Sequence, residues 1–495
     1  GGVSTVGLPG FKAENLLSSG KPIFTAAQQA YLNNHKVDSS NYYGSVDDFD
    51  DVRADMATAR LEYDFSDTTK LSNISRWGKT THQYLTTLPF SLSIASATTD
   101  ASQTQVGRST NNGDTENKIL TNQTSLVTSF STGSLKHDLS SGVELTREEM
   151  NTYGWTGSVG TATKTSLYHP DRNLPTTLTR NIYGDTSGEM DTYSVFAFDT
   201  IEILPQFSVN AGVRLDHYKL DSTSWVNTAA SGQTANYVSQ NLKDDGNLFN
   251  WKVGGLFKPT ENGSIYTSFA TSANPVGVDG GDGSEAIGQA YMDLKPEEAR
   301  TIELGTKWDL FNDRLNLTAA IFRTEKQNTR IQLDAGTYTN GGESKVDGIE
   351  LTATGKITDK WDITAGYSYL DTEMTNPGPS CTRAGVCTYP NPAKGKQLPN
   401  VPENSATLWT TYKVLPELTL GAGAIAMDKV YGDAANTKWV PGYVRYDAMA
   451  RYNVNKNVDL QLNVNNLADT RYFTKAYSSH YATEAEGRSA VLSLN

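Results

Sequence analysis

The side chains that most often carry catalysis or bind metals form no recognisable pattern in this chain. Its six histidines are scattered and include no His-Glu-x-x-His motif. The sequence also lacks a Gly-x-Ser-x-Gly motif, a phosphate-binding loop and a dinucleotide fingerprint. Asp47, Asp48, Asp50 and Asp51 could bind a divalent cation together, but a solvated acidic loop explains them more simply. We therefore expect no enzyme activity, no resident metal and no cofactor.

The two cysteines, Cys381 and Cys387, lie in one short segment rich in Pro, Gly and Asn. A close pair in a loop, with no other cysteine in the chain, favours a disulfide bond. A metal site would need further Cys or His residues nearby, and the segment contains none. The pair therefore predicts a disulfide and an oxidising compartment, such as the outer side of a bacterial envelope.

Composition excludes several classes of protein. The chain has 495 residues and a net charge of −13, which argues against a nucleic-acid partner. No run of 18 apolar residues occurs, so we expect no transmembrane helix. A membrane-spanning strand needs only about 9–11 residues, half of them facing away from lipid, so low mean hydropathy still permits a membrane barrel. The first residues lack a basic start and an apolar core, so we expect no signal peptide and a mature or truncated product.

A period-two alternation of apolar and polar residues recurs along most of the chain. Leu460, Leu462 and Val464, for example, alternate with polar residues. Short and long polar gaps between such segments follow each other in strict alternation. Apolar faces toward lipid, polar faces toward a wet interior and this order of gaps describe a transmembrane antiparallel β-barrel. We predict about 17 strands in residues 51–495, with short turns in the periplasm and long loops outside the cell.

An odd number of crossings would place residues 1–50 outside the cell as a further exterior loop. Bacterial single-chain barrels have an even strand count, so either the count is off by one or strands are missing before residue 51. The remaining long exterior loops are predicted at residues 86–114, 149–189, 222–246, 271–293, 332–343, 374–403 and 428–439.

Charged residues within the predicted strands follow the polar parity, so we expect them to face the lumen. They could line a path for a solute, but pairing with one another or with a plug is the simpler interpretation. The residues predicted to face the lumen are Arg214, Asp216, Glu303, Lys307, Arg445, Asp447 and Arg451.

The sequence contains two sets of characteristic phrases. The first set is residues 294–308, 346–351, 440–447 and 459–472, and the second is residues 117–124, 168–171, 178–181, 247–252 and 260–263. The first set resembles TonB-dependent outer-membrane receptors, and the second resembles their catecholate siderophore receptor group more closely. The resemblance implies a barrel of roughly 22 strands with an N-terminal plug, of which this chain would hold the barrel portion without the plug and without about five strands. Ala468 stands where the family usually has Phe, and the chain stops short of the family's terminal aromatic residue.

The resemblance also implies the ligand, which would be a ferric catecholate siderophore captured by the exterior loops. Such a complex is flat, aromatic and anionic, so aromatic faces and Arg or Lys side chains suit it. Each residue of this kind in a loop could equally be a packing residue. The candidates are Trp155, Tyr168, Arg172, Arg180, Trp225, Tyr237, Tyr338, Arg383, Tyr389, Lys394, Tyr431 and Trp439.

We therefore expect an outer-membrane receptor for the TonB-dependent uptake of ferric siderophores. Iron would arrive inside the siderophore, the TonB complex would act through the plug, and the chain would be a monomer surrounded by outer-membrane lipid. Two alternatives remain at this stage, a passive outer-membrane porin and a secreted β-repeat protein active on polysaccharide.

Overall fold

The structure is a computed structural model. It describes residues 3–4, 17–18, 21–22, 24–38, 40–94, 100–158, 164–173, 175–229, 233–275, 294–333, 338–382, 385–477 and 481–495. Within these residues, no helix is long and apolar enough to cross a membrane.

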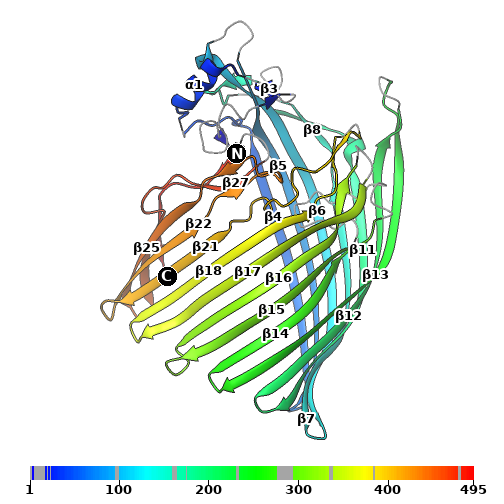
Figure 1. Ribbon diagram of the computed structural model, residues 1–495, viewed down its shortest axis with the longest axis vertical. Coiled ribbons are helices and arrows are strands. Elements are labelled where there is room, and N and C mark those ends of the chain that lie inside the picture. Colours follow the sequence, from blue (N-terminus) through cyan, green and yellow to red (C-terminus); the bar gives the residue numbers. More distant parts are fainter. Residues whose placement is uncertain are drawn as a thin grey trace.

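Seventeen long strands and the short β9 (Lys164–Ser166) form one antiparallel sheet that curves as a barrel wall (Figure 1). The prediction of about 17 strands is therefore confirmed for the described part of the chain. The long strands are β4 (Phe49–Ser66), β5 (Thr69–Ile94), β6 (Thr104–Thr132), β7 (Leu135–Thr152), β11 (Thr186–Leu204), β12 (Phe207–Asn227), β13 (Tyr237–Thr260), β14 (Gly263–Asn274), β15 (Glu297–Leu310), β16 (Leu315–Gln332), β17 (Tyr338–Thr358), β18 (Trp361–Asn376), β21 (Asn404–Lys413), β22 (Leu418–Met427), β25 (Tyr443–Asn455), β26 (Val458–Asn465) and β29 (Ser489–Leu494).

Strands that follow one another in the wall pair antiparallel, and their connections are alternately short and long. β7 pairs with β11 along its whole length, from Thr152 opposite Thr186 to Lys136 opposite Glu202. The registers run from β4 to β7, across to β11 and on to β29. No residue register joins β29 to β4 within the described residues, and β4 is solvent-exposed at every position except Asp55. Within the described residues, the registers thus leave β4 (18 residues) and β29 (six residues) as the terminal strands of the paired series.

Short turns connect the strands at one end of the wall and long segments connect them at the other, as predicted (Figure 1). The short β6–β7 turn uses Gly133 with φ of 65°, and the β15–β16 turn places Phe311, Asn312 and Asp313 consecutively in the left-handed region. Several strands extend further than predicted: β12 continues to Asn227 and β13 begins at Tyr237, within the predicted loop 222–246. These extensions carry polar residues on both faces, so the alternation that marks the membrane-spanning part fades there.

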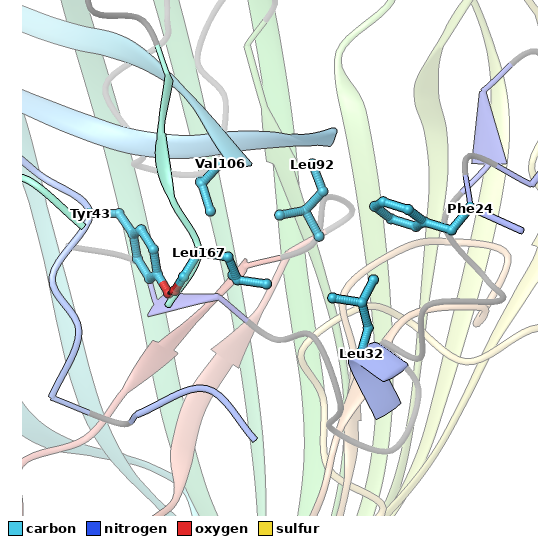
Figure 2. Close-up of a cluster of buried hydrophobic side chains, with 6 residues drawn as sticks. All are labelled: Phe24, Leu32, Tyr43, Leu92, Val106 and Leu167. Atoms are coloured by element: carbon cyan, nitrogen blue, oxygen red, sulfur yellow. The ribbon is translucent and has the colours of Figure 1, made fainter. Parts of the chain in front are cut away.

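A cap of loop segments covers part of the end with the long loops. The helix α1 (Ala26–Asn34) begins at Thr25, whose hydroxyl and the Gln28 side chain cap it reciprocally. Figure 2 shows the core of this cap, where side chains from α1, β5, β6 and the segment after β9 meet; its residues are Phe24, Leu32, Tyr43, Leu92, Val106 and Leu167. The Tyr43 hydroxyl donates to the Leu167 carbonyl at 2.5 Å, and burial raises the pKa of Tyr43 to about 12.

The acidic residues considered as a cation site instead bond to neighbouring groups. Asp48 accepts from the Thr87 amide at 3.0 Å and from the Thr87 hydroxyl at 2.8 Å. Asp47 accepts from the Thr176 amide at 3.2 Å, and Asp50 lies 2.7 Å from the His82 ring. No group of three His, Cys, Asp or Glu side chains suited to a metal occurs in the described residues.

A second small core supports the loops near the C-terminus, where Val430, Val440, Phe473, Ala476 and Ala482 are buried together. It is built by β23 (Val430–Tyr431), β24 (Trp439–Val440), β27 (Phe473–Ala476) and β28 (Tyr481–Glu484), with β1 (Val3–Ser4) paired to β28. The other short elements are β2 (Leu17–Ser18), β3 (Lys21–Pro22), η2 (Ala101–Gln103), β8 (Trp155–Ser158), β10 (Thr177–Arg180), η3 (Ile182–Gly184), β19 (Ser380–Cys381) and β20 (Cys387–Thr388).

Candidate functional site

The seven residues predicted to face the lumen lie on one face of the sheet. Arg214 and Asp216 alternate with Val213 and Leu215, which are 47% and 44% exposed on the opposite face. Residues paired directly across neighbouring strands lie on the same face of the sheet. The pairs from β12 to β25 therefore place Glu303 and Lys307 on β15 on the same face as Arg214. They also place three residues of β25 on this face: Arg445, Asp447 and Arg451. We call this face the inner face and its opposite the outward face.

Charged side chains on the inner face are mostly paired with one another. Of the two interpretations of the sequence, a path for a solute and mutual pairing, the structure shows the pairing. Arg214 donates to Glu144, to Asp216 and to the Ser194 hydroxyl, each at 2.8 Å. Arg445 donates to Asp447 at 2.7 Å, and the Asp447 carboxylate also accepts from the Asn466 amide. These pairs connect neighbouring positions of the wall, and their carboxylates are largely buried.

One hydrogen bond, one cation–π contact and one ion pair complete the set. Glu303 accepts from the Tyr266 hydroxyl at 2.5 Å, and the Lys307 ammonium lies 5.6 Å from the centre of the same ring. Arg451 lies 3.0 Å from Asp459.

Aromatic rings lie flat across glycines on the inner face. A Cβ added to Gly212 would lie 1.9 Å from Cδ1 of Phe198, its direct partner across the strands. Tyr266 covers Gly305 and Phe322 covers Gly348 in the same way. Because the rings occupy the place of the missing side chains, they stay close to the wall and leave the lumen wide.

A hollow of about 510 Å³ opens on the inner face across β4, β5, β6, β7, β11 and β12. Three methionines, Met56, Met150 and Met190, line it together with charged Arg76 and Glu148. Methionine side chains adapt to irregular ligands, and the volume lies in the usual range of small-molecule sites, about 300–1,000 Å³. The hollow was not predicted from the sequence, because its residues come from six strands and share no local motif.

Four of the twelve predicted ligand candidates gather on the outward face beyond the apolar strand residues. Together with two tyrosines that the sequence analysis missed, they form what we call the outward aromatic patch: Tyr153, Trp155, Arg180, Tyr183, Trp225 and Tyr237. Tyr183 stacks on Tyr237 with ring centres 4.2 Å apart, and Trp225 meets Tyr183 edge-on at 5.5 Å.

Arg180 lies over the other two aromatic rings of the outward aromatic patch. It lies 5.9 Å from the Tyr153 ring centre and 5.6 Å from the Trp155 ring centre. It also forms a 2.7 Å ion pair with Asp185, and this hydrogen bond lowers the pKa of the Asp185 carboxyl. Leu215 and Trp225 lie an even number of positions apart on the single strand β12, so their side chains lie on the same face. Counting along the sequence from Leu215 would have placed Trp225 on the outward face.

Two other candidates, Tyr431 and Trp439, lie directly opposite each other in the β23–β24 pair. Their neighbours Val430 and Val440 point into the second small core, so the two aromatic rings lie on the other side of this pair. The Lys429 ammonium lies 5.2 Å from the Tyr431 ring centre and 5.8 Å from the Trp439 ring centre. Lys429 was not among the predicted residues, although a cation two positions before Tyr431 was a usable signal.

The remaining candidates are dispersed. Tyr168 packs beside the cap core, with its hydroxyl 3.5 Å from the His35 carbonyl. Arg172, Tyr389 and Lys394 are exposed. The side chain of Tyr338 and the whole of Arg383 lie outside the described residues.

The predicted disulfide between Cys381 and Cys387 is present and links β19 to β20.

Comparison with known proteins places these features in a family. Residues 9–467 match the family model described as TonB dependent receptor-like, beta-barrel. The probable TonB-dependent siderophore receptor PiuA of Acinetobacter baumannii is 47% identical over 93% of this chain and 63% of its own length. The catecholate siderophore receptor Fiu of Escherichia coli K12 is 36% identical over the whole chain and 65% of its own length.

Solved structures agree with the family match. The crystal structure of PiuA from A. baumannii superposes with a TM-score of 0.83 at 46% identity, covering 93% of this chain and 66% of the other. The closed form of Fiu from E. coli K12 gives a TM-score of 0.84 at 35% identity, covering 100% and 69%. The chain thus spans slightly less than two thirds of the length of the curated relatives named above.

Proposed function

Since the chain belongs to the TonB-dependent receptor β-barrel family, we propose that it forms the wall and exterior loops of an importer for ferric catecholate siderophores. It is a barrel of the bacterial outer membrane, and the family consists of transport receptors rather than enzymes. The observation that carries the substrate class is the similarity to Fiu over the whole chain, together with the higher identity to PiuA. The family match also argues against a passive porin and against a secreted polysaccharide-active protein.

Capture of the ligand is assigned to Lys429, Tyr431 and Trp439. Aromatic faces stack on catechol rings, and a lysine held above them supplies positive charge to an anionic complex. Lysine is suited to this role because its flexible stem can move from the rings to the ligand when the ligand arrives.

The hollow lined by Met56, Met150 and Met190 is the second contact assigned to the ligand, on its way along the inner face. Its methionines accept ligands of varied shape. Iron travels as the cargo of the siderophore.

The importer needs a gate and a source of energy, which we assign to a plug in the lumen and to the TonB complex. The two edges of the wall support a larger closed barrel, because unpaired strand edges are not tolerated in lipid. We propose that further strands of the receptor fill the gap between β29 and β4 and that the receptor acts as a monomer. Native mass spectrometry of the full-length receptor tests the monomer, and a dimer would overturn it.

Growth under iron limitation tests the function. A strain lacking its own catecholate receptors would be complemented with the full-length receptor and fed single siderophores. Growth is expected with ferric catecholates, is expected to require TonB, and is not expected with ferric hydroxamates. Growth without TonB would favour passive diffusion, and failure with every catecholate would refute the substrate class.

A further inference from the structure

The outward aromatic patch lies on the side of the wall that turns away from the lumen. Trp225 shares its parity with Leu215, and Tyr153 shares its parity with Leu145; both leucines are exposed apolar residues of the outward face. A ligand bound at the patch would therefore be outside the barrel, beside the membrane, and not on the path through it.

A belt of charged residues separates the patch from the apolar part of the outward face. Arg147 donates twice to Asp191 at 2.7 Å, and Lys243 lies 2.8 Å from Asp221. Such charges do not belong in hydrocarbon, where one Arg or Lys on the lipid face costs about 2–4 kcal/mol at the midplane. The belt thus marks the upper boundary of the apolar layer.

The patch lies above that boundary. Trp225 follows Asp221, the belt residue on the same strand, by four residues. Four residues span about 13 Å along a strand at 3.3 Å per residue, or about 10 Å in height at a tilt near 40°. Phospholipid headgroups add only about 5–8 Å to each side of the hydrocarbon core. Figure 1 shows how far the β12–β13 hairpin extends at its upper right. Only a lipid with a long headgroup reaches this height.

The chemistry of the patch suits sugars. Tyr183, Trp225 and Tyr237 are 36–42% exposed, so their ring surfaces are accessible from the membrane side. A sugar ring presents polarised C–H groups on its faces, which the negative face of an aromatic ring attracts.

A groove of about 290 Å³ lies at the other part of the patch, and polar side chains line it. It is lined by Tyr153, Trp155 and Arg180 together with Gln83, Asp114, Glu116, Thr81 and Thr115. Planar amide, carboxylate and guanidinium groups can donate or accept two hydrogen bonds at once, which matches adjacent hydroxyls of a sugar. The Trp155 indole donates to Asp114 at 3.0 Å, so this ring is held in place before any ligand binds.

We propose that the outward aromatic patch binds the carbohydrate headgroup of the glycolipid in the outer leaflet of the surrounding membrane. The charged belt lies at the level where that headgroup begins, and the patch lies where its sugars extend. The site is separate from ligand import, since it faces the opposite side of the wall.

The test uses the full-length receptor purified in detergent. Binding would be measured by native mass spectrometry and titration with two probes, a lipopolysaccharide with its complete core sugars and the same lipid truncated to its lipid A part. The variants are Y183A/Y237A and W155A, with Y389A as the control because Tyr389 is an exposed exterior tyrosine outside the patch. Thermal unfolding would verify that each variant is folded.

We expect the patch variants to bind the complete lipopolysaccharide about tenfold more weakly than the parent and Y389A, and the truncated lipid with unchanged affinity. Equal affinity of all variants for the complete lipopolysaccharide would overturn the proposal. A loss of ferric catecholate binding in the patch variants, with lipopolysaccharide binding intact, would also overturn it and would assign the patch to the imported ligand. Failure of catecholate-dependent growth in the parent would leave this proposal untouched.

Discussion

Replacing Gly212 by alanine should destabilise the barrel, whereas the same replacement at Gly188 should not. Both glycines lie on the inner face of adjacent strands, and neither has a positive φ. A Cβ on Gly212 would lie 1.9 Å from Cδ1 and 2.4 Å from Cε1 of Phe198, while a Cβ on Gly188 meets no atom within 4 Å. The two sites therefore differ in what the added methyl group meets and not in backbone strain.

The size of the effect follows from these contacts. The clash is with the base of the Phe198 ring, so the whole side chain must move, and overpacking of this kind costs about 1–3 kcal/mol. Moving the ring also breaks its contact with the Lys252 ammonium, 5.0 Å from the ring centre, which adds about 0.5–1 kcal/mol. Both variants gain about 0.4–1 kcal/mol from a less flexible unfolded chain. G212A should thus be less stable than G188A by about 1.5–4 kcal/mol.

Equilibrium unfolding of the refolded full-length receptor in lipid vesicles measures this difference. Tryptophan fluorescence would give the denaturant concentration at the midpoint of unfolding for each variant. A difference in midpoint reports a difference in stability where the dependence of the unfolding free energy on denaturant concentration (the m-value) is the same. F198A/G212A should be more stable than the sum of its single changes predicts, because F198A removes the ring that the new methyl group meets. Equal midpoints for G212A and G188A, or strict additivity of F198A and G212A, would refute the idea that the ring fills the place of a side chain.

Three further predictions concern the loops and the edges of the wall. K429A should weaken ferric catecholate binding about tenfold in a calorimetric titration, while K360A, in a turn at the other end of the wall, should bind like the parent; equal affinities would exclude Lys429 from the site. Arg180 lowers the pKa of Asp185, so the stability contributed by this pair is present above the unfolded-state pKa of about 3.9 and is lost as the pH falls through the lower folded-state value. The protection factor of the Gly154 amide, which donates to Asp185 at 2.8 Å, should therefore fall as the pH drops below about 3.9, and a protection factor that stays constant until the whole receptor unfolds in acid would contradict this. Finally, alternate amides of β4 should exchange rapidly in the isolated chain and slowly in the full-length receptor, and slow exchange in both would mean that the β4 edge is already covered.

The alternation of apolar and polar residues within the strands was sufficient to predict the wall. Together with the lengths of the gaps between strands, it predicted the number of long strands and the order of short turns and long loops. It also predicted that Arg214 and Glu303 share a face. It succeeded because lipid on one side and water on the other impose a period of two on every strand. Closure of the barrel could not be tested by alternation, since pairing between distant strands leaves no local trace in the sequence.

The binding residues were predicted less well. Trp225 and Tyr237 were placed in a loop that could face any direction, because their strands leave the membrane and both faces become polar there. The hollow lined by Met56, Met150 and Met190 was missed because the three methionines are far apart in the sequence. The pairing of β4, β5, β6, β7 and β11 in register brings their side chains together, and no local motif records it.

The rings that lie across glycines have a spectroscopic consequence. The α protons of a glycine beneath an aromatic ring lie in the shielding region of its ring current, so their resonances shift upfield. Tilting a ring away from the wall would return them toward ordinary values. Isotope-labelled glycine would therefore report on contacts inside the lumen without any added probe. The reporter pairs on the inner face are Tyr84 with Gly113, Phe198 with Gly212, Tyr218 with Gly246, Tyr266 with Gly305, Phe322 with Gly348 and Trp409 with Gly423.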